Sequence, residues 1–242
     1  MHPSLTLLRY LRANQFNYEK TIEHIQRNIA WRKDYNVDEL MKLDPEIILG
    51  CKLEDLTAFY PHWQSGLDKT GRPVIYKQYG KFDASKVKKL VGGTFDNVIK
   101  YHVWEQEVCS IICTHESHKL GNIIETSTHV IDVKDMKLSQ ITSDFMSLVK
   151  LFAEIDQKQY PETLGKMFII NVPSIFPFVW KGIKTLLDPA TASKINICGG
   201  PKEYEPILKK FIGEDNLPQN YGGTLPSLNN KVVFCFIFIL KY

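Results

Sequence analysis

The chain of 242 residues is too short for a scaffold of many domains and fits one large domain, or a small domain followed by a larger one. With 44% hydrophobic and 24% charged residues, its composition excludes the disordered, collagen-like and low-complexity classes. The 30 basic and 27 acidic residues leave a net charge of +3, too small an excess to indicate a nucleic-acid-binding protein.

The N-terminal part of the chain has the pattern of a small helical bundle. Apolar residues recur at spacings of three and four over residues 7–11 and 22–29, with charged residues between them. Asp44 followed by Pro45 predicts the start of a further helix, with Asp as the N-cap. Residues 68–73 (DKTGRP) then predict a tight turn before the pattern changes.

After this turn, predicted strands alternate with predicted helices. We expect strands at residues 74–76, 128–133, 166–172 and 194–198. We expect helices at residues 94–119, 139–157 (capped by Ser139), 174–187 and 202–212. Strands that alternate with helices of this length predict crossover connections, and therefore an α/β fold with a mainly parallel sheet.

The two ends of the chain and its cysteines indicate the cellular compartment of the protein. Residues 1–4 lead directly into a helical pattern and do not resemble a signal peptide. The cysteines are five in number and scattered, which argues against a disulfide framework and for a reducing, cytoplasmic setting. Residues 232–240 (VVFCFIFIL) are apolar but about half the ~20 residues of a spanning helix, so we interpret them as a strand in a tail of unknown role.

The common motifs of α/β enzymes are missing from the sequence. It contains no G-x-S-x-G, no P-loop, no G-x-G-x-x-G after a strand and no H-E-x-x-H, so we predict that the protein is not an enzyme. Cys109, Cys113, His115 and His118 could be taken for a zinc site. Because no second pair of ligands follows, we favour buried cysteines beside surface histidines, and we predict no metal site.

A pair of polar residues stands out on one predicted strand. Ser127 and His129 are two residues apart, so both point to the same face of the sheet as Ile131. An unpaired polar group buried on an apolar face costs about 1–3 kcal/mol. Either a neighbouring helix or a ligand must therefore supply their partners, and the sequence leaves this choice open.

Residues 174–187 (SIFPFVWKGIKTLL) carry more large apolar side chains than one packed helix face can bury. Periodicity alone does not distinguish a well-buried core helix from a surface that contacts a partner or a membrane.

Several motifs occur in an order that is typical of one family. They are residues 7–13 (LLRYLRA), 31–33 (WRK), 68–74 (DKTGRPV), 125–127 (ETS), 160–166 (YPETLGK), 169–173 (IINVP), 187–195 (LDPATASKI) and 217–223 (LPQNYGG). On these motifs the chain resembles CRAL-TRIO lipid-binding proteins, and most closely the fungal secretory-pathway phosphatidylinositol/phosphatidylcholine transfer branch of that family. The resemblance extends over about residues 4–226.

The resemblance implies a small N-terminal helical lobe packed on a CRAL-TRIO α/β lobe, whose sheet floors an apolar cavity for one phospholipid. By position, a gate that closes the cavity and contacts the membrane corresponds to the helix with Phe176, Phe178 and Trp180. We accordingly divide the chain into an N-terminal lobe at residues 1–50, a lipid-binding domain at 51–228 and the tail at 229–242.

The resemblance also implies which residues bind the lipid head group. Carried over by motif, Glu162, Thr191 and Lys194 correspond to the site for inositol phosphate. Lys194 and the Thr191 hydroxyl suit a phosphodiester, while Glu162 can accept from inositol hydroxyls or pair with Lys194. Ser127 and His129 correspond to the site for a choline lipid, where His129 stands in place of a smaller Thr and narrows the pocket.

A departure from the family pattern concerns the charge of the inositol site. Where the family member has two basic residues after Leu-Arg-Ala, this chain has Asn14 and Gln15. One phosphate contact therefore loses its charge, and the strength of phosphatidylinositol binding stays open.

From these observations we predict a cytoplasmic protein that binds and exchanges phosphatidylinositol, with phosphatidylcholine as a second ligand, or presents the lipid to lipid kinases. We expect a monomer that contacts membranes transiently, binds no nucleic acid and uses no cofactor besides the bound lipid. One alternative is a carrier of a sterol, tocopherol-like or retinoid ligand. A second alternative is a regulatory module that transfers no lipid.

Overall fold

A computed structural model describes residues 3–228 of the chain. The first part is helical, as predicted, and its helices are α1 (Pro3–Ala13), α2 (Tyr18–Asp34), α3 (Val37–Leu40), α4 (Pro45–Leu49) and α5 (Leu53–Phe59). Asp44 caps α4 by accepting a hydrogen bond from the backbone N–H of Glu46, with Pro45 in the first turn. The helix start predicted at Asp44 is therefore confirmed.

The described residues form one five-stranded sheet in the order of the sequence, and all its pairs except β1–β2 are parallel. Its strands are β1 (His62–Leu67), β2 (Pro73–Gln78), β3 (Ser127–Asp132), β4 (Leu164–Ile170) and β5 (Ile195–Ile197). The predicted α/β fold with a mainly parallel sheet is confirmed. The edge strand β1 was not predicted, because its sequence HWQSGL carries little apolar periodicity.

The turn predicted at residues 68–73 joins β1 to β2 as a hairpin. The Asp68 carboxylate accepts hydrogen bonds from the backbone N–H groups of Thr70 and Arg72 and from the Thr70 hydroxyl. Gly71 has a φ of 87°, which favours glycine at this position. The side chain of Asp68 thus organises the whole turn.

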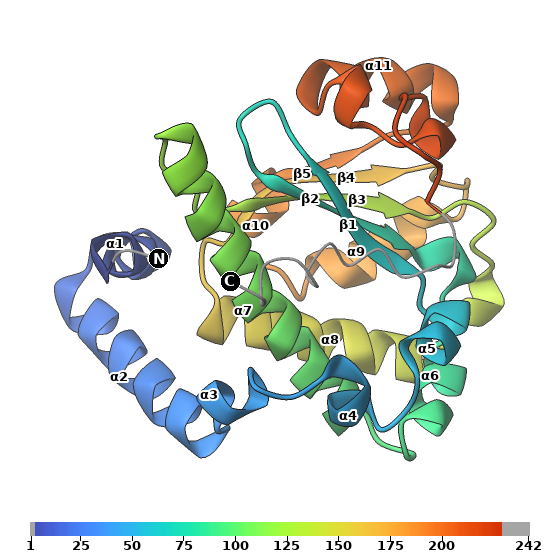
Figure 1. Cartoon of the computed structure of the whole chain (residues 1–242). Coiled ribbons are helices and arrows are strands. Elements are labelled where there is room, and N and C mark those ends of the chain that lie inside the picture. Colours follow the sequence, from blue (N-terminus) through green and yellow to red (C-terminus); the bar gives the residue numbers. More distant parts are fainter. Residues whose placement is uncertain (1–2, 229–242) are drawn as a thin grey trace.

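The remaining helices connect and cover the strands (Figure 1). They are α6 (Ala84–Leu90), α7 (Asp96–Leu120), α8 (Ser143–Gln159), α9 (Phe176–Lys184), α10 (Pro189–Ser193) and α11 (Pro201–Phe211). The helix predicted from Ser139 begins later, at Ser143, because Thr142 is the residue whose side chain accepts from the backbone N–H of Phe145. Ser139 lies instead in the short 3-10 turn Leu138–Gln140.

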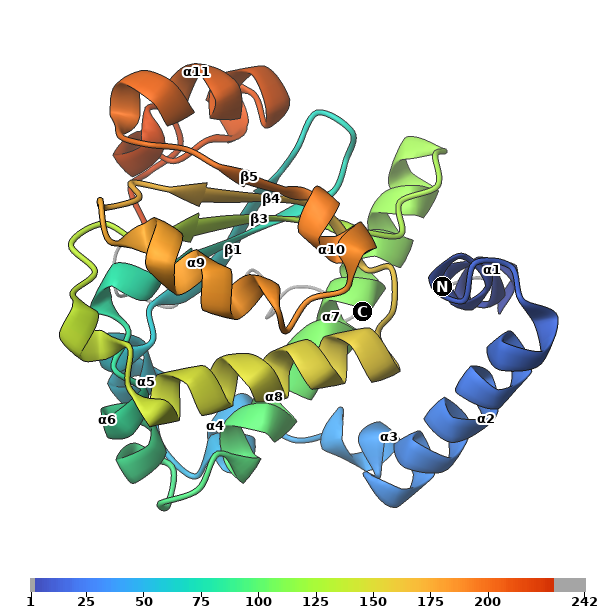
Figure 2. The ribbon, with the colours of Figure 1, turned by 180° about the vertical axis from the view of Figure 1, so that it is seen from behind.

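The two faces of the sheet are covered differently. Figure 2 shows α11 on one side of the sheet and α8 and α9 on the other. The α11 side packs tightly around fully buried residues such as Tyr76, Phe168 and Leu208. The other side carries a larger apolar core but also a cavity, and that face positions the candidate site.

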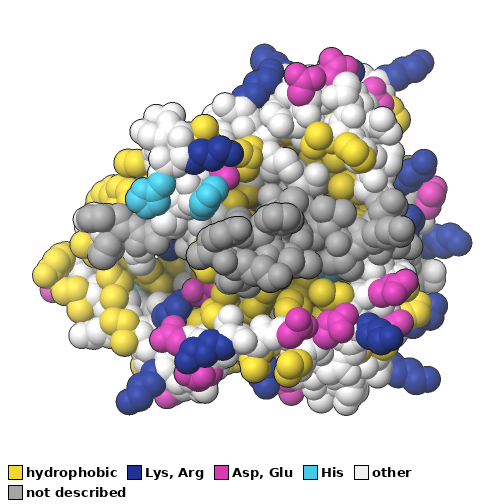
Figure 3. All heavy atoms as spheres, viewed as in Figure 1, with side chains coloured by type: hydrophobic (Ala, Val, Ile, Leu, Met, Phe, Trp, Pro, Cys, Tyr) yellow, Lys and Arg dark blue, Asp and Glu magenta, His cyan; other side chains and the backbone are white. Residues whose placement is uncertain are grey.

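Figure 3 shows one face of the molecule, with Lys, Arg, Asp and Glu side chains interspersed along its top, right and lower edges and hydrophobic side chains along its left edge. The tail at residues 229–242, including the strand interpreted at 232–240, lies outside the described residues.

Candidate functional site

A cavity of about 660 Å³ lies between the sheet and helices α8 and α9. Its floor is one face of the sheet, which exposes Ile131, Met167, Ile169 and Ile195 to it. Alternation along the strands explains this set, because every second residue of β3 and β4 points to the same face. A mainly apolar cavity of this size falls within the ~300–1,000 Å³ typical of pockets that bind small molecules and cofactors.

Ser127 and His129 both line this cavity, as expected from their spacing with Ile131. The Ser127 hydroxyl and His129 Nε2 are 2.9 Å apart, so each supplies a hydrogen-bond partner to the other. In register, His129 lies between Ile75 of β2 and Met167 of β4. Ser127 and His129 therefore supply one hydrogen-bond partner to each other, and the Cys109 thiol of α7 also hydrogen-bonds with Ser127.

Burial, reinforced by the positive charge of Lys77, lowers the pKa of His129 to about 3. At neutral pH the ring is uncharged and can give or take one further hydrogen bond. A histidine with so low a pKa is a weak base, so the Ser127–His129 pair is suited to hydrogen bonding and poorly suited to activating a nucleophile.

Glu162 and Lys194 meet at the end of the cavity where β4 and β5 begin. Lys194 Nζ lies 2.7 Å from Glu162 Oε2, and both side chains are about one-fifth exposed, at 23% and 22%. Glu162 has a φ of 59°, a backbone conformation that is uncommon for a residue other than glycine. The turn that imposes this conformation directs the carboxylate toward Lys194.

Thr191 lines the same end of the cavity, on the short helix α10. Its hydroxyl donates to Asp188 Oδ2 at 2.6 Å, and its backbone N–H donates to Asp188 Oδ1 at 2.8 Å. Asp188 is thus the N-cap of α10. Because the Thr191 proton is engaged in this bond, its hydroxyl oxygen remains available to accept a hydrogen bond from a ligand hydroxyl rather than to donate to a phosphate.

The N-terminal lobe completes this end of the cavity. Asn14 and Gln15, the positions where the family pattern lacks its basic residues, both line it. Arg12, which is not among the predicted site residues, lines it as well, with its Nη1 2.5 Å from Glu125 Oε1. Arg12 belongs to the motif at residues 7–13, and its closeness in sequence to Asn14 and Gln15 is the signal that could have identified it.

The three residues of the predicted gate are separated by the geometry of α9. Phe176 is 3% exposed and, like Trp180, lines the cavity. Phe178 points outward and is 72% exposed. The helix is shorter than predicted, because it ends at Lys184 and Asp188 then starts α10. Residues 174–187 therefore combine a buried core face with one exposed aromatic ring.

A second polar cluster lies in the cavity wall, and no motif in the sequence marked it. Lys77, His102 and Asp156 line the cavity from β2, α7 and α8. His102 Nε2 is 2.7 Å from Asp156 Oδ1, and Lys77 Nζ donates to the Tyr60 hydroxyl at 2.9 Å. Behind them, Glu105 Oε2 lies 3.7 Å from His102 Nδ1 and 4.0 Å from Lys77 Nζ.

The charges of this cluster stabilise one another. Burial raises the pKa of Glu105, but Lys77 and His62 outweigh burial and bring it down to about 2. Burial lowers the pKa of His102, but the charge and hydrogen bond of Asp156 more than compensate, so that it is raised above its ordinary value. The only sequence signal for this cluster was a lysine at an inward-facing strand position.

The cysteines and histidines of α7 lie apart from the cavity. Cys113 is buried, Cys109 is half-buried, and His115 and His118 are exposed, so the preferred interpretation holds for Cys113 and the two histidines and only in part for Cys109. Among residues 3–228, no group of three or more His, Cys, Asp or Glu side chains is arranged to hold a metal ion.

Comparisons with known proteins identify the family. The model of the CRAL/TRIO domain matches residues 60–223, and the model of the CRAL/TRIO N-terminal domain matches residues 1–27. The chain belongs to the CRAL-TRIO family. The resemblance drawn from its motifs is therefore confirmed. Like the crystal structure of Sfh5, with which it shares 20% sequence identity, it has the CRAL-TRIO fold, with a TM-score of 0.68 over 98% of this chain and 79% of that one.

Two curated relatives of this CRAL-TRIO protein are similar over most of its length. It is 32% identical over 232 residues to the phosphatidylinositol/phosphatidylcholine transfer protein SFH12 of Arabidopsis thaliana, covering 93% of this chain and 40% of that relative. It is 34% identical over 225 residues to the Sec14 cytosolic factor of Schizosaccharomyces pombe, covering 90% of this chain and 73% of that relative. The chain spans less than half the length of the plant relatives. Within residues 3–228, no helix is long and apolar enough to cross a membrane.

Proposed function

We propose that this CRAL-TRIO protein binds one phospholipid in its cavity and transfers it between membranes, with phosphatidylinositol as the favoured ligand and phosphatidylcholine as the second. The observation that carries the proposal is a cavity with an apolar floor and a polar end formed by Glu162, Thr191 and Lys194. Two relatives of similar sequence support it by their names, one as a phosphatidylinositol/phosphatidylcholine transfer protein and one as a Sec14 cytosolic factor.

The apolar floor explains why a carrier accelerates lipid exchange. Burial of one methylene group is worth about 0.8 kcal/mol, so that moving one sixteen-carbon chain into water costs on the order of 12 kcal/mol. A cavity that replaces the bilayer removes most of this barrier. The protein makes and breaks no covalent bond in such a cycle, so its role is that of a non-enzymatic carrier.

At the polar end, the Glu162–Lys194 pair is suited to an inositol phosphate. A phosphodiester oxygen competes with Glu162 for the Lys194 ammonium, and the released carboxylate then accepts from inositol hydroxyls. Thr191 contributes an acceptor, and Arg12 supplies a second positive charge near Asn14 and Gln15. The protein would work as a cytoplasmic monomer, contact membranes transiently and present phosphatidylinositol to lipid kinases.

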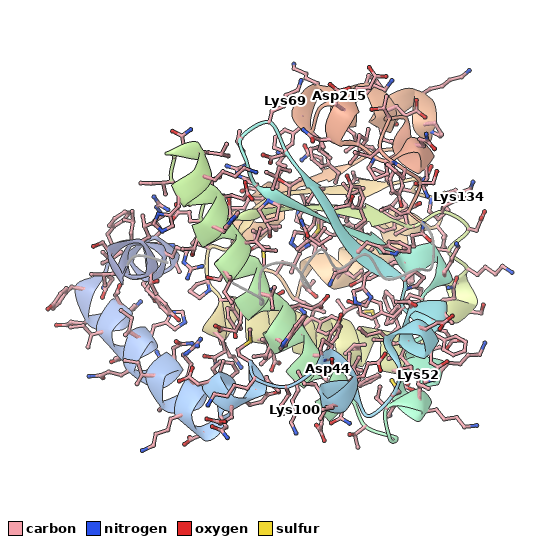
Figure 4. All side chains as sticks on the ribbon, viewed as in Figure 1. Asp44, Lys52, Lys69, Lys100, Lys134 and Asp215 are labelled. Atoms are coloured by element: carbon pink, nitrogen blue, oxygen red, sulfur yellow. The ribbon has the colours of Figure 1, made fainter. Side chains whose placement is uncertain are left out.

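The head-group role is tested by Lys194→Met, which keeps much of the side-chain volume but removes the charge. A charge-assisted hydrogen bond contributes about 1.5–3 kcal/mol, so we expect at least a tenfold loss of phosphatidylinositol transfer between vesicles. Phosphatidylcholine transfer should change less than threefold. Lys134→Met, at an exposed position labelled in Figure 4, is the matched control and should transfer both lipids normally.

Equal losses for the two lipids in Lys194→Met would contradict the head-group assignment. A protein that takes up no phospholipid at all would favour the regulatory-module alternative.

Membrane contact through α9 is tested at Phe178. This ring is exposed, so Phe178→Ser should change the free energy of unfolding by less than about 0.5 kcal/mol. If the ring inserts into the membrane interface, the rate of lipid transfer should fall severalfold while the amount of lipid bound at equilibrium stays the same. Tyr18→Ser, at another exposed aromatic residue, serves as the control. An unchanged transfer rate in Phe178→Ser would remove Phe178 from the gate.

A further inference from the structure

Two thiols lie next to each other on α7, outside the residues assigned to the lipid head group. Cys109 and Cys113 are four residues apart, and side chains at this spacing lie one above the other on the same face of a helix. Their thiols hydrogen-bond to each other. Both are free cysteines, Cys113 buried and Cys109 half-buried. The two sulfurs are therefore in contact, and part of Cys109 is open to small reagents.

The two thiols differ in acidity. Hydrogen bonds from Cys113 and Ser127 stabilise the thiolate form of Cys109, so they lower the pKa of Cys109 against the effect of burial. Donation to Cys109, together with burial, raises the pKa of Cys113. The single Cys113 proton has a second acceptor within reach, the Thr126 carbonyl oxygen at 3.6 Å from Sγ. Cys109 is thus the more reactive thiol, and Cys113 is its protonated neighbour.

A buried cation stands near both sulfurs. Arg9 of α1 is 8% exposed, and within residues 3–228 its Nε has no hydrogen-bond partner. Besides the hydrogen bond from Cys113, the Arg9 charge also lowers the pKa of Cys109, while Glu105 acts in the opposite direction. Because the thiolate and not the thiol is the nucleophile, a cation held at this place favours reaction at Cys109.

The helix sets the strain of a bond between the two sulfurs. Cβ atoms four residues apart on a helix are separated by about 5–6 Å, whereas the Cβ atoms of a disulfide are separated by about 3.5–4.5 Å. A disulfide at this spacing therefore requires a local distortion of α7, and strained disulfides are more readily reduced. It also closes a loop of very few residues, so it gains little stability from chain entropy. Such a bond is suited to reversible formation.

We propose that Cys109 and Cys113 form a peroxide-reactive dithiol, which a hydroperoxide converts to a reversible disulfide. In the first step the Cys109 sulfur attacks the terminal oxygen of the hydroperoxide. An S–O bond forms, the O–O bond breaks, and the other oxygen leaves with the thiol proton as water or an alcohol. In the second step the Cys113 sulfur attacks the Cys109 sulfur, the S–O bond breaks, and water leaves with the Cys113 proton. The two thiols lose two electrons, and the hydroperoxide gains them.

The hydroperoxide group has two sources. Hydrogen peroxide reaches the exposed part of Cys109 from the solvent. The hydroperoxide of an oxidised acyl chain reaches it from the cavity, because Ser127 both lines the cavity and hydrogen-bonds with Cys109. The second source rests on the proposed lipid-binding function, whereas the first does not. A protein that takes up no phospholipid therefore still forms the disulfide in hydrogen peroxide.

The test determines the oxidation state of each cysteine in the purified full chain. One sample is treated with hydrogen peroxide, and a second with phosphatidylcholine vesicles that carry the hydroperoxide of linoleoyl phosphatidylcholine. Free thiols are then alkylated, and the chain is digested with trypsin for mass spectrometry. Both cysteines fall in the single peptide 101–119, because no Lys or Arg lies between its ends. A disulfide within this peptide removes two hydrogen atoms and leaves no thiol to alkylate.

We expect the Cys109–Cys113 disulfide to form at least ten times faster than Cys51 is oxidised. Cys51 is also half-buried, but burial and Asp55 raise its pKa. Formation in one sample only identifies the solvent or the cavity as the source, and formation in both identifies both. No disulfide in either sample, or a rate no higher than that of Cys51, overturns the inference. Reduced glutathione should restore both thiols, and a disulfide that resists it contradicts the reversible form.

Two variants separate the steps of the reaction. Cys113→Ser should form no disulfide and should leave Cys109 as a sulfenic acid, which dimedone traps. Cys51→Ser is the matched control and should form the disulfide at the wild-type rate. If Cys113 in a folded Cys109→Ser protein is oxidised as fast as Cys109 in Cys113→Ser, Cys109 is not the attacking thiol and the assignment is overturned.

Discussion

The two faces of the central sheet differ in what their alternate residues contact. On the α11 face, Tyr76, Phe168 and Leu208 are fully or almost fully buried against one another. On the opposite face, His129 and Met167 line a cavity, although they are the sequence neighbours of Thr128 and Phe168, respectively. One strand therefore serves stability with one set of residues and ligand binding with the other, because successive side chains point to opposite sides.

This comparison predicts that truncating a side chain lowers the free energy of unfolding by unequal amounts on the two faces of β4. Phe168 is 2% exposed and packs edge-to-face against Phe211, so Phe168→Ala should lower the free energy of unfolding by about 3–5 kcal/mol. Its neighbour Met167 borders existing empty space, so Met167→Ala creates little new cavity and should cost about 1–2 kcal/mol. Urea unfolding of the lipid-free proteins measures both values. Similar losses would mean that the cavity is filled by protein in solution.

The pH dependence of stability should sharpen the comparison, because the cavity face carries a buried histidine. The pKa of His129 is lowered to about 3 in the folded protein and is about 6.5 in the unfolded chain. Between these values the unfolded state binds more protons, so that acidification destabilises the folded protein. From pH 7 to pH 4 the contribution of His129 amounts to about 3 kcal/mol of lost unfolding free energy.

His129→Gln keeps a polar side chain that cannot be protonated in this range. Its free energy of unfolding should therefore fall less between pH 7 and pH 4 than that of the wild-type protein. His115→Gln, at a side chain that is 54% exposed, should follow the wild-type curve. If the His129→Gln and wild-type curves run parallel, His129 is accessible to water in the cavity.

The smallest predicted difference concerns hydroxyl groups on adjacent residues of β3. Thr128 is fully buried on the α11 side and donates to Asp68 Oδ2 at 2.7 Å, so Thr128→Val should cost about 1–3 kcal/mol. Ser127→Ala leaves His129 beside the cavity, where water can replace the lost partner, and should cost less than about 1 kcal/mol. Thermal unfolding measured on both variants provides the comparison, and a larger loss in Ser127→Ala would reverse it.

Much of the fold was accessible from local patterns. The apolar runs of β3 and β4 and the long periodic helix α7 were predicted to within about two residues, because each is long or strongly patterned. The prediction was wrong at Ser139, where Thr142 provides the cap, and it overlooked β1, a polar edge strand. Where the local sequence pattern is this weak, contacts with other parts of the chain determine the secondary structure of the segment.

The candidate site likewise contains residues that the sequence predicted and residues that it did not. Motif resemblance selected Glu162 and Lys194, and the structure brings them within 2.7 Å of each other, although their role toward a ligand stays a prediction. Arg12 was not predicted as a site residue, because its position in a helical pattern does not by itself indicate a function. The three predicted gate residues could not be sorted into cavity-facing and exposed positions before the ends of α9 were known.

By itself, the sequence determined the order of the strongly patterned helices and strands, the parallel part of the sheet and the face on which Ser127, His129 and Ile131 lie, because these follow from spacing along each element. Only the tertiary structure decided that Lys77, His102 and Asp156 meet in one wall of the cavity. These residues are separated by long stretches of chain on three elements, and no local periodicity encodes the packing of two helices over a strand. Their mutual charge compensation exists only after those elements come together, because it depends on distances of a few ångströms.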